Sequence, residues 1–215
     1  MNRICRYLPL LFSMSFAYAQ SAVDVNLGFG TFHDKAAGGG IDANTGATCT
    51  TGHTTGSTCL LTPALSGFFM GFGGDIMLNK HVGFGGEASL QPKKQDYAGF
   101  QSRQIFYDVN GIYAPVNQKK VMLRLEGGIG GATTSFSYTA SSCVGTAVCQ
   151  TQSQAVGSAK HFQIHAGLGV QLYVTEHIFI RPQFDLHYVP NFTNQFGSSM
   201  APGAMVFIGY SLGDR

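Results

Sequence analysis

The chain has 215 residues, enough for one domain of ordinary size, and only 11% of them are charged. Such a low charged fraction is unusual for a soluble surface. Beyond the amino-terminal segment there is no run of about 20 consecutive apolar residues, which excludes a membrane-spanning helix.

The amino-terminal segment, residues 1–19, has the organisation of a secretory signal. Arg3 and Arg6 form a positive start, an apolar run follows, and residues 17–19 read Ala-Tyr-Ala, the small-x-small form that signal peptidases cleave. The apolar run is too short to span a membrane as a helix. Cleavage before Gln20 reduces the 13 basic residues to 11, equal to the 11 acidic residues. A neutral mature chain gives a nucleic-acid partner no electrostatic support.

The mature chain is dominated by segments in which apolar residues alternate with polar or small ones. In residues 162–174 every second side chain is apolar, and those between are mostly Gln, His or Gly. Strict alternation indicates β-strands with two unlike faces. Long strands with charged groups on the minority face are typical of a membrane β-barrel, whose outer face meets lipid and whose inner face is polar. Eight such segments follow one another: residues 22–32, 65–78, 82–91, 103–114, 121–136, 162–174, 178–188 and 203–212.

The connections between these segments alternate in length. Short turns on one side and long loops on the other are typical of bacterial outer-membrane barrels, and an even number of strands closes the sheet without an exposed edge. We therefore predict that residues 20–215 form an eight-stranded antiparallel up-and-down transmembrane β-barrel in the bacterial outer membrane, with both chain ends on the periplasmic side. The short connections are residues 79–81, 115–120 and 175–177, and the long ones are residues 33–64, 92–102, 137–159 and 189–202.

A soluble, calycin-like ligand-binding barrel of eight strands is the alternative fold. It would point its apolar face inward and its charged face outward. The minority face carries few charges and much glycine, and the four long loops, rich in Ser and Thr, lie at one end only. These features favour the membrane barrel.

Four cysteines remain in the mature chain, all in the long loops: Cys49, Cys59, Cys143 and Cys149. An even number of cysteines behind an export signal indicates disulfides. Each pair is local in sequence, so we predict one bridge within each loop, Cys49–Cys59 and Cys143–Cys149. Zinc binding is the alternative, but the spacings differ from those of zinc ligands and no His lies at ligand spacing. We expect neither a metal nor a cofactor.

Two parts of the chain resemble the small outer-membrane β-barrel family, the type of the transmembrane domain of outer membrane protein A and its single-domain relatives. They are residues 73–87, which begin Gly-Gly-Asp, and residues 167–188, which contain Gly-Leu-Gly-Val-Gln-Leu-Tyr and Ile-Arg-Pro-Gln. The resemblance rests on strand rhythm, glycine placement and loop asymmetry, and it extends over the mature chain. For such a barrel we expect contact with outer-membrane lipid and lipopolysaccharide, and handling by the barrel-assembly machinery.

Successive side chains of a strand point to opposite faces, so the odd or even position of a residue, its parity, decides its face. By parity, the charged side chains of the strands fall on the inner face. An eight-stranded barrel is just wide enough for its own side chains to fill, and buried charges need partners. We predict an internal ion-pair network in which Arg124 and Glu126 join Arg181 and either Glu87 or Asp185. An ion pathway is the alternative. The predicted luminal ionisable residues are Asp75, Glu87, Asp108, Arg124, Glu126, His161, His165, Arg181, Asp185 and His187.

The sequence gives catalysis little support. Asp185 and His187 are two residues apart and both fall on the inner face, but a Ser–His–acid set also needs a serine at their level. Only Ser89 and Ser211 can be suggested for it, so we expect no enzymatic activity. Two functions remain: a structural or surface-interaction barrel that displays its loops to an extracellular partner, and a narrow porin-like channel.

Overall fold

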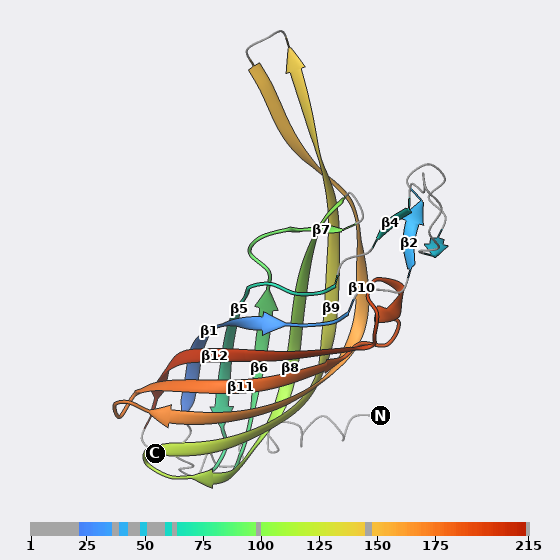
Figure 1. Cartoon of the computed structure of the whole chain (residues 1–215). Coiled ribbons are helices and arrows are strands. Elements are labelled where there is room, and N and C mark those ends of the chain that lie inside the picture. Colours follow the sequence, from blue (N-terminus) through green and yellow to red (C-terminus); the bar gives the residue numbers. More distant parts are fainter. Residues whose placement is uncertain are drawn as a thin grey trace, which may run out of the picture.

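The chain folds into a closed antiparallel β-barrel, with a long hairpin and a small separate sheet at one end (Figure 1). The predicted export signal lies outside the described residues. Within the described part, no helix is long and apolar enough to cross a membrane. The computed structural model describes residues 22–35, 39–42, 48–50, 59–61, 64–97, 100–144 and 148–213.

Each of the eight predicted segments corresponds to one barrel strand, so the predicted fold class is confirmed. The strand over residues 178–188 has the predicted bounds, and most of the others differ by a few residues at their ends. The barrel strands are β1 (Val23–Phe32), β5 (Phe69–Met77), β6 (Val82–Leu90), β8 (Phe100–Asn117), β9 (Val121–Val144), β10 (Val148–Tyr173), β11 (Ile178–Tyr188) and β12 (Met200–Leu212).

The barrel closes because every barrel strand has two strand neighbours. Strands β6, β5, β1, β12, β11, β10, β9 and β8 are hydrogen-bonded in that order, and β6 also pairs with β8. In this closure Val82 of β6 lies opposite Tyr113 of β8. Val23 of β1 lies opposite Leu212 of β12, so the first and last strands meet at the end that holds the short turns. A closed ring leaves no strand edge in lipid.

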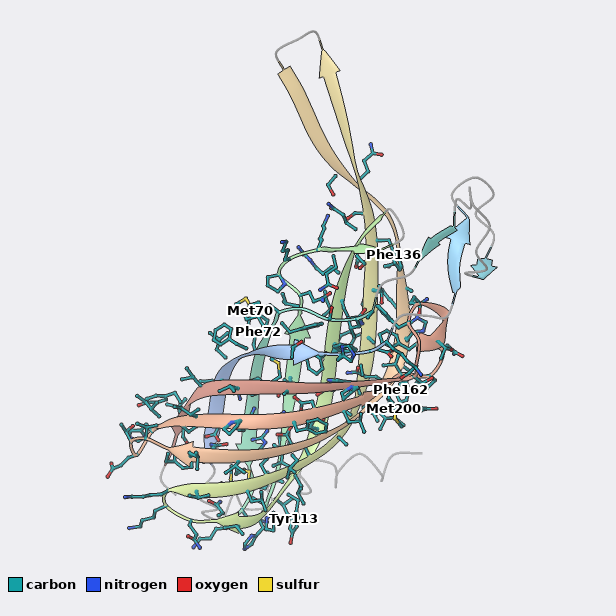
Figure 2. The ribbon with its side chains drawn as sticks, viewed as in Figure 1. Met70, Phe72, Tyr113, Phe136, Phe162 and Met200 are labelled. Carbon is teal, nitrogen blue, oxygen red and sulfur yellow. The ribbon has the colours of Figure 1, made fainter. Side chains whose placement is uncertain are left out.

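Because apolar and polar side chains alternate along the strands, the barrel has an apolar outer face and a polar inner face. On β8 and β9 the outward Val109 and Ile129 are 66% and 61% exposed, whereas Asp108 and Asn110 on the inner face are buried. Figure 2 shows how densely side chains cover the barrel strands. An exposed apolar band around a closed barrel is what a bilayer requires.

The prediction of a loop over residues 137–159 is wrong for most of its length. Strands β9 and β10 remain paired up to Val144 and Val148 and form a two-stranded arm that projects beyond the barrel (Figure 1). We call residues 138–144 and 148–159 the β9–β10 arm. Among the described residues, the pairing of β8 with β9 ends at Ser137 and that of β11 with β10 begins at Ile164. The arm therefore has two outer edges without a strand neighbour there.

The other long connections also contain secondary structure. Residues 33–64 include a three-stranded sheet in the order β3-β2-β4, and residues 92–102 include β7, which pairs with the start of β8. Residues 189–202 include the 3-10 turn η2. The short turns predicted at residues 79–81 and 175–177 are confirmed to within one residue, whereas the one predicted at 115–120 is shorter, residues 118–120, because β8 continues to Asn117. The bounds are β2 (Gly39–Asp42), β3 (Thr48–Thr50), β4 (Cys59–Leu61), β7 (Gln95–Tyr97) and η2 (Phe192–Asn194).

Candidate functional site

Side chains fill the barrel interior in three layers. Strand β8 shows their order: Ile112 near the short turns belongs to an apolar layer, Asp108 belongs to a polar layer, and Phe106 towards the loops belongs to an aromatic layer. The apolar layer consists of Met77, Ile112, Ala114 and Met122. The polar layer holds the predicted luminal carboxylates and arginines together with His165, whereas His161 and His187 lie against aromatic rings. The contacts of the polar layer decide what the interior can do.

Arg124 of β9 joins two acidic side chains in the polar layer. Its Nη1 donates to both carboxylate oxygens of Asp75 on β5, at 2.7 and 2.6 Å, and its Nε donates to Glu126. The side chains of all three residues are almost fully buried. Because β6 and β8 lie between β5 and β9 in the barrel wall, this contact ties two non-adjacent strands together through the lumen.

Arg181 of β11 reaches the same centre from another side. Its Nη1 lies 3.5 Å from Asp75, its Nη2 lies 3.6 Å from Glu87, and its guanidinium carbon lies 4.6 Å from the centre of the Phe207 ring. The Phe207 face attracts the cation and replaces part of its lost hydration. Asp75 thus bridges the two arginines, although the predicted network did not include it.

Asp185 contacts a histidine and an amide in place of an arginine. His165 Nε2 lies 3.1 Å from Asp185 Oδ1, and Gln183 Nε2 donates to the same oxygen at 2.7 Å. The other ring nitrogen of His165 lies 3.0 Å from Asn110 Oδ1 and 3.5 Å from Asp108. His165 therefore links the β8 wall to the β11 wall.

Glutamines complete the polar layer, and they were not predicted as interior residues. Gln163 Nε2 donates to Asp108 Oδ2 at 3.1 Å, and Gln171 Nε2 donates to Asp24 Oδ2 at 3.0 Å. All four side chains are buried. The alternation of side chains along β10 places both glutamines on the inner face, so their position could have been predicted. They were missed because only ionisable residues were considered for the interior.

Aromatic side chains close the loop end of the interior. Phe106 stacks on His187 with ring centres 4.5 Å apart, and His187 lies 4.8 Å from the ring of His165. Phe192 and Phe196, from the loop that contains η2, pack on each other at 4.6 Å and are buried in the same cluster. This loop therefore folds back over the mouth of the barrel.

Glycines on the inner face make room for the large aromatic rings. A methyl group added at Gly209 of β12 would overlap the ring of Phe179 on β11, and one added at Gly28 of β1 would overlap the ring of Phe207 on β12. These inner-face glycines therefore accommodate phenylalanine rings of neighbouring strands.

The suggested catalytic residues form no catalytic set among the described residues. His187 is held in the aromatic stack, and no hydrogen bond joins it to Asp185. The hydroxyl of Ser89 is buried and has no hydrogen-bond partner in the described part of the chain. In that same part, no group of three or more His, Cys, Asp or Glu could hold a metal ion.

The backbone positions of the predicted disulfides differ between the two loops. Cys143 and Cys149 are direct partners in the register of the β9–β10 arm. Cys49 and Cys59 lie on β3 and β4, which are separated by β2, opposite Gly40 and Asp42 respectively. The first pair thus lies on adjacent strands and the second pair on strands two apart.

A closed eight-stranded barrel with an apolar exterior, a filled polar interior and its longest connections at one end is a transmembrane barrel of the bacterial outer membrane. The family model of the outer membrane protein beta-barrel domain matches residues 7–210, and the chain belongs to that family. It is a bacterial outer-membrane protein. No match was found among curated protein sequences.

Three solved structures illustrate the shared fold. Ail of Yersinia pestis, in complex with the heparin analogue sucrose octasulfate, is 12% identical over 90% of this chain and 99% of its own, with a TM-score of 0.51. OprG of Pseudomonas aeruginosa is 14% identical over 91% and 98%, with a TM-score of 0.51. Neisserial surface protein A is 10% identical over 91% and 97%, with a TM-score of 0.52.

Proposed function

We propose that this protein is a closed, non-conducting barrel that holds its extracellular loops at the cell surface, where they contact a partner. The observation that carries the proposal is the filled interior. Arg181, at the centre of the lumen, has no exposed surface and lies between Asp75, Glu87 and the Phe207 ring. A hydrated ion cannot pass a cross-section occupied by paired, buried side chains.

The mouth of the barrel supports the same proposal. Phe192 and Phe196 are buried against Phe106 and Phe32, so an aromatic layer separates the polar layer from the loop end. The apolar layer around Met122 separates it from the short-turn end. An ion would have to cross both apolar layers without hydration, which is costly.

Conductance measurements test this proposal against the narrow channel. We expect the folded protein to give no reproducible unit conductance in planar bilayers at 1 M KCl. The double variant Phe192→Ala/Phe196→Ala opens the mouth alone, so we expect it to remain silent because the Arg124 and Arg181 contacts persist below. A discrete conductance of the unaltered protein that changes when Arg181 is replaced by glutamine would establish the channel and refute the proposal.

The proposed contact surface is the loop end, stiffened by disulfides. Direct opposition of Cys143 and Cys149 supports a bridge across the β9–β10 arm, since antiparallel partners are about 4.5–5.5 Å apart, within disulfide range. Strands two apart are separated by about 9–10 Å. The Cys49–Cys59 bridge therefore requires the small β3-β2-β4 sheet to rearrange. We propose the arm bridge as the stable one and the other as conditional on that rearrangement.

Lipopolysaccharide is a proposed neighbour of the outer rim. Arg103 and Lys160 lie on the outward face of β8 and β10, in register with Ser135 and Thr133 of the strand between them. Two cations and two hydroxyls above the apolar band suit the phosphates of lipopolysaccharide. Less lipopolysaccharide retained on purified Arg103→Gln/Lys160→Gln protein than on the unaltered protein is the expected result, and equal retention would contradict it.

We further propose that residues 1–19 direct export and that the barrel-assembly machinery inserts the chain. Amino-terminal sequencing of the mature protein should then begin at Gln20. The resemblance in fold to Ail, whose structure contains a heparin analogue, agrees with an extracellular partner bound at the loop end. For this chain, the β9–β10 arm carries no charged residue, which favours a partner held by hydrogen bonds.

A further inference from the structure

Two neighbouring short turns carry three lysines at the short-turn end of the barrel, here called the rim. No other lysine lies on this rim in the part of the chain that the structure describes. Residues 78–81 connect β5 to β6 and contain Lys80, and residues 118–120 connect β8 to β9 and contain Lys119 and Lys120. All three lysines are exposed. The remaining short turn, residues 174–177, contains Glu176 and no lysine. Among the residues that the structure describes, the lysines of this rim therefore lie on one side of it.

Hydrogen bonds hold the two lysine-bearing turns against each other. The N–H of Ala114 donates to the His81 carbonyl at 2.7 Å, and Asn117 Nδ2 donates to the Lys80 carbonyl at 2.9 Å. The first turn is itself shaped by Asn79 Oδ1, which accepts from two backbone N–H groups at 2.8 Å. The three exposed lysines thus lie on two turns that hydrogen bonds join into one unit.

An exposed apolar strip extends from these lysines along β6 and β8 towards the middle of the barrel. Val82 of β6 and Tyr113 of β8 are cross-strand partners and are 44% and 52% exposed, and Val116 and Val121 lie beside the second turn with exposed side chains. Figure 2 shows Tyr113 at the end of the barrel away from the β9–β10 arm. A tyrosine at this depth presents its ring to acyl chains and its hydroxyl to headgroups.

We propose that Lys80, Lys119 and Lys120 form a binding site for the phosphate of an anionic phospholipid in the periplasmic leaflet. In outer-membrane barrels the short turns face the periplasm, so this rim lies at the level of phospholipid headgroups. The lysines match the phosphate in charge, and the Val82–Tyr113 strip takes the acyl chains. A neutral headgroup would leave the three exposed lysines of these two joined turns without a counter-charge. The proposed occupant is therefore an anionic lipid such as phosphatidylglycerol.

Native mass spectrometry of the folded, full-length protein in neutral detergent tests the site. Phosphatidylglycerol and phosphatidylcholine with identical acyl chains are added together. The preference is the ratio of protein with one bound phosphatidylglycerol to protein with one bound phosphatidylcholine. Each lysine near an anionic lipid contributes about a fivefold factor. Lys119→Gln/Lys120→Gln should therefore lower the preference for phosphatidylglycerol about 25-fold, and Lys80→Gln alone about fivefold. Ammonium acetate at about 1 M, where the screening length is about 3 Å, should abolish the preference.

The control variant Lys35→Gln/Lys93→Gln removes the same charge from exposed positions at the loop end and should keep the preference. Comparison of boiled and unboiled gel samples establishes that each variant is folded. An unchanged preference in the Lys119/Lys120 variant, or an equal fall in the control, overturns the proposal.

Sedimentation with purified peptidoglycan is a second experiment. Binding there that depends on the lysines, without any preference between the two lipids, would assign the site to the cell-wall polymer and overturn the lipid assignment.

Discussion

Replacing Arg124 by alanine removes the cation that holds two carboxylates of the polar layer. Arg124 donates to both oxygens of Asp75 and to Glu126, and its side chain is 4% exposed. After the replacement, Asp75 keeps Arg181 at 3.5 Å. Glu126 keeps no hydrogen bond or ion pair within the described part of the chain. The cost is therefore mainly that of one buried, unpaired carboxylate.

Breaking a buried pair by removing one partner costs about 3–5 kcal/mol, which is a factor of roughly 10² to 10³·⁵ in the folding equilibrium constant. An ion pair exposed to water contributes no more than about 1 kcal/mol. The layers around Met122 and Phe106 separate the pair from both ends of the barrel. We therefore expect the larger cost.

Urea unfolding in lipid vesicles measures this cost. The chain has no tryptophan, so circular dichroism and the fraction of heat-shifted protein on gels replace tryptophan fluorescence. Lys93→Ala, in an exposed loop, is the control and should leave the unfolding midpoint almost unchanged. The double variant Arg124→Met/Glu126→Gln removes the unpaired carboxylate as well. It should recover more than half of the loss, because neutral replacement of a buried pair is often close to neutral in stability.

Equal midpoints for Arg124→Ala and Lys93→Ala would refute the reasoning. Such a result would mean that water reaches Glu126 and solvates it, and hence that the lumen is not sealed. Loss of stability in Arg124→Ala without recovery in the double variant would point instead to lost packing around the arginine stem.

Three further predictions concern the barrel and its loops. Unboiled and boiled samples should migrate differently in SDS gels, because a closed barrel with a fully paired backbone resists detergent, and identical migration would contradict the membrane fold. Mass spectrometry of non-reduced digests should find Cys143 linked to Cys149, whereas free thiols or bridges between the two loops would refute local pairing. Deleting residues 50–58 should abolish adhesion to the extracellular partner, while unboiled and boiled samples of the variant still migrate differently. Identical migration of the two samples would mean that the barrel needs this segment in order to fold. 

The periodicity of the sequence predicts the barrel strands well because the membrane enforces it. Within the bilayer one face must be apolar, so alternation marks residues 178–188 to the residue. Outside the bilayer both faces of a strand meet water, and this constraint ends. The β9–β10 arm is rich in Ser, Thr and Gln without regular alternation, and its strands are therefore invisible to the same criterion. For the same reason the burial of Phe192 and Phe196 was not predicted.

Parity also explains how far the interior could be predicted. It places Arg124, Glu126 and Arg181 on the inner face, where the structure has them. Which carboxylate each arginine meets depends on the stagger of the strands around the barrel, and parity carries no information about stagger. The partner of Arg124 is Asp75, 49 residues away in the chain, and the partner of Asp185 is His165.

The absence of charge from the β9–β10 arm determines the conditions in which it can hold a partner. Residues 127–159 contain no Asp, Glu, Lys, Arg or His, and the arm's edges have no strand neighbour among the described residues. A contact made there relies on backbone and hydroxyl or amide hydrogen bonds, which neither dissolved ions nor mild acid weaken as they weaken ion pairs. Attachment through this arm would hold equally in dilute water, in brine and in an acidified compartment. Because trypsin-like enzymes cut only after Lys or Arg, the arm would also escape their cleavage.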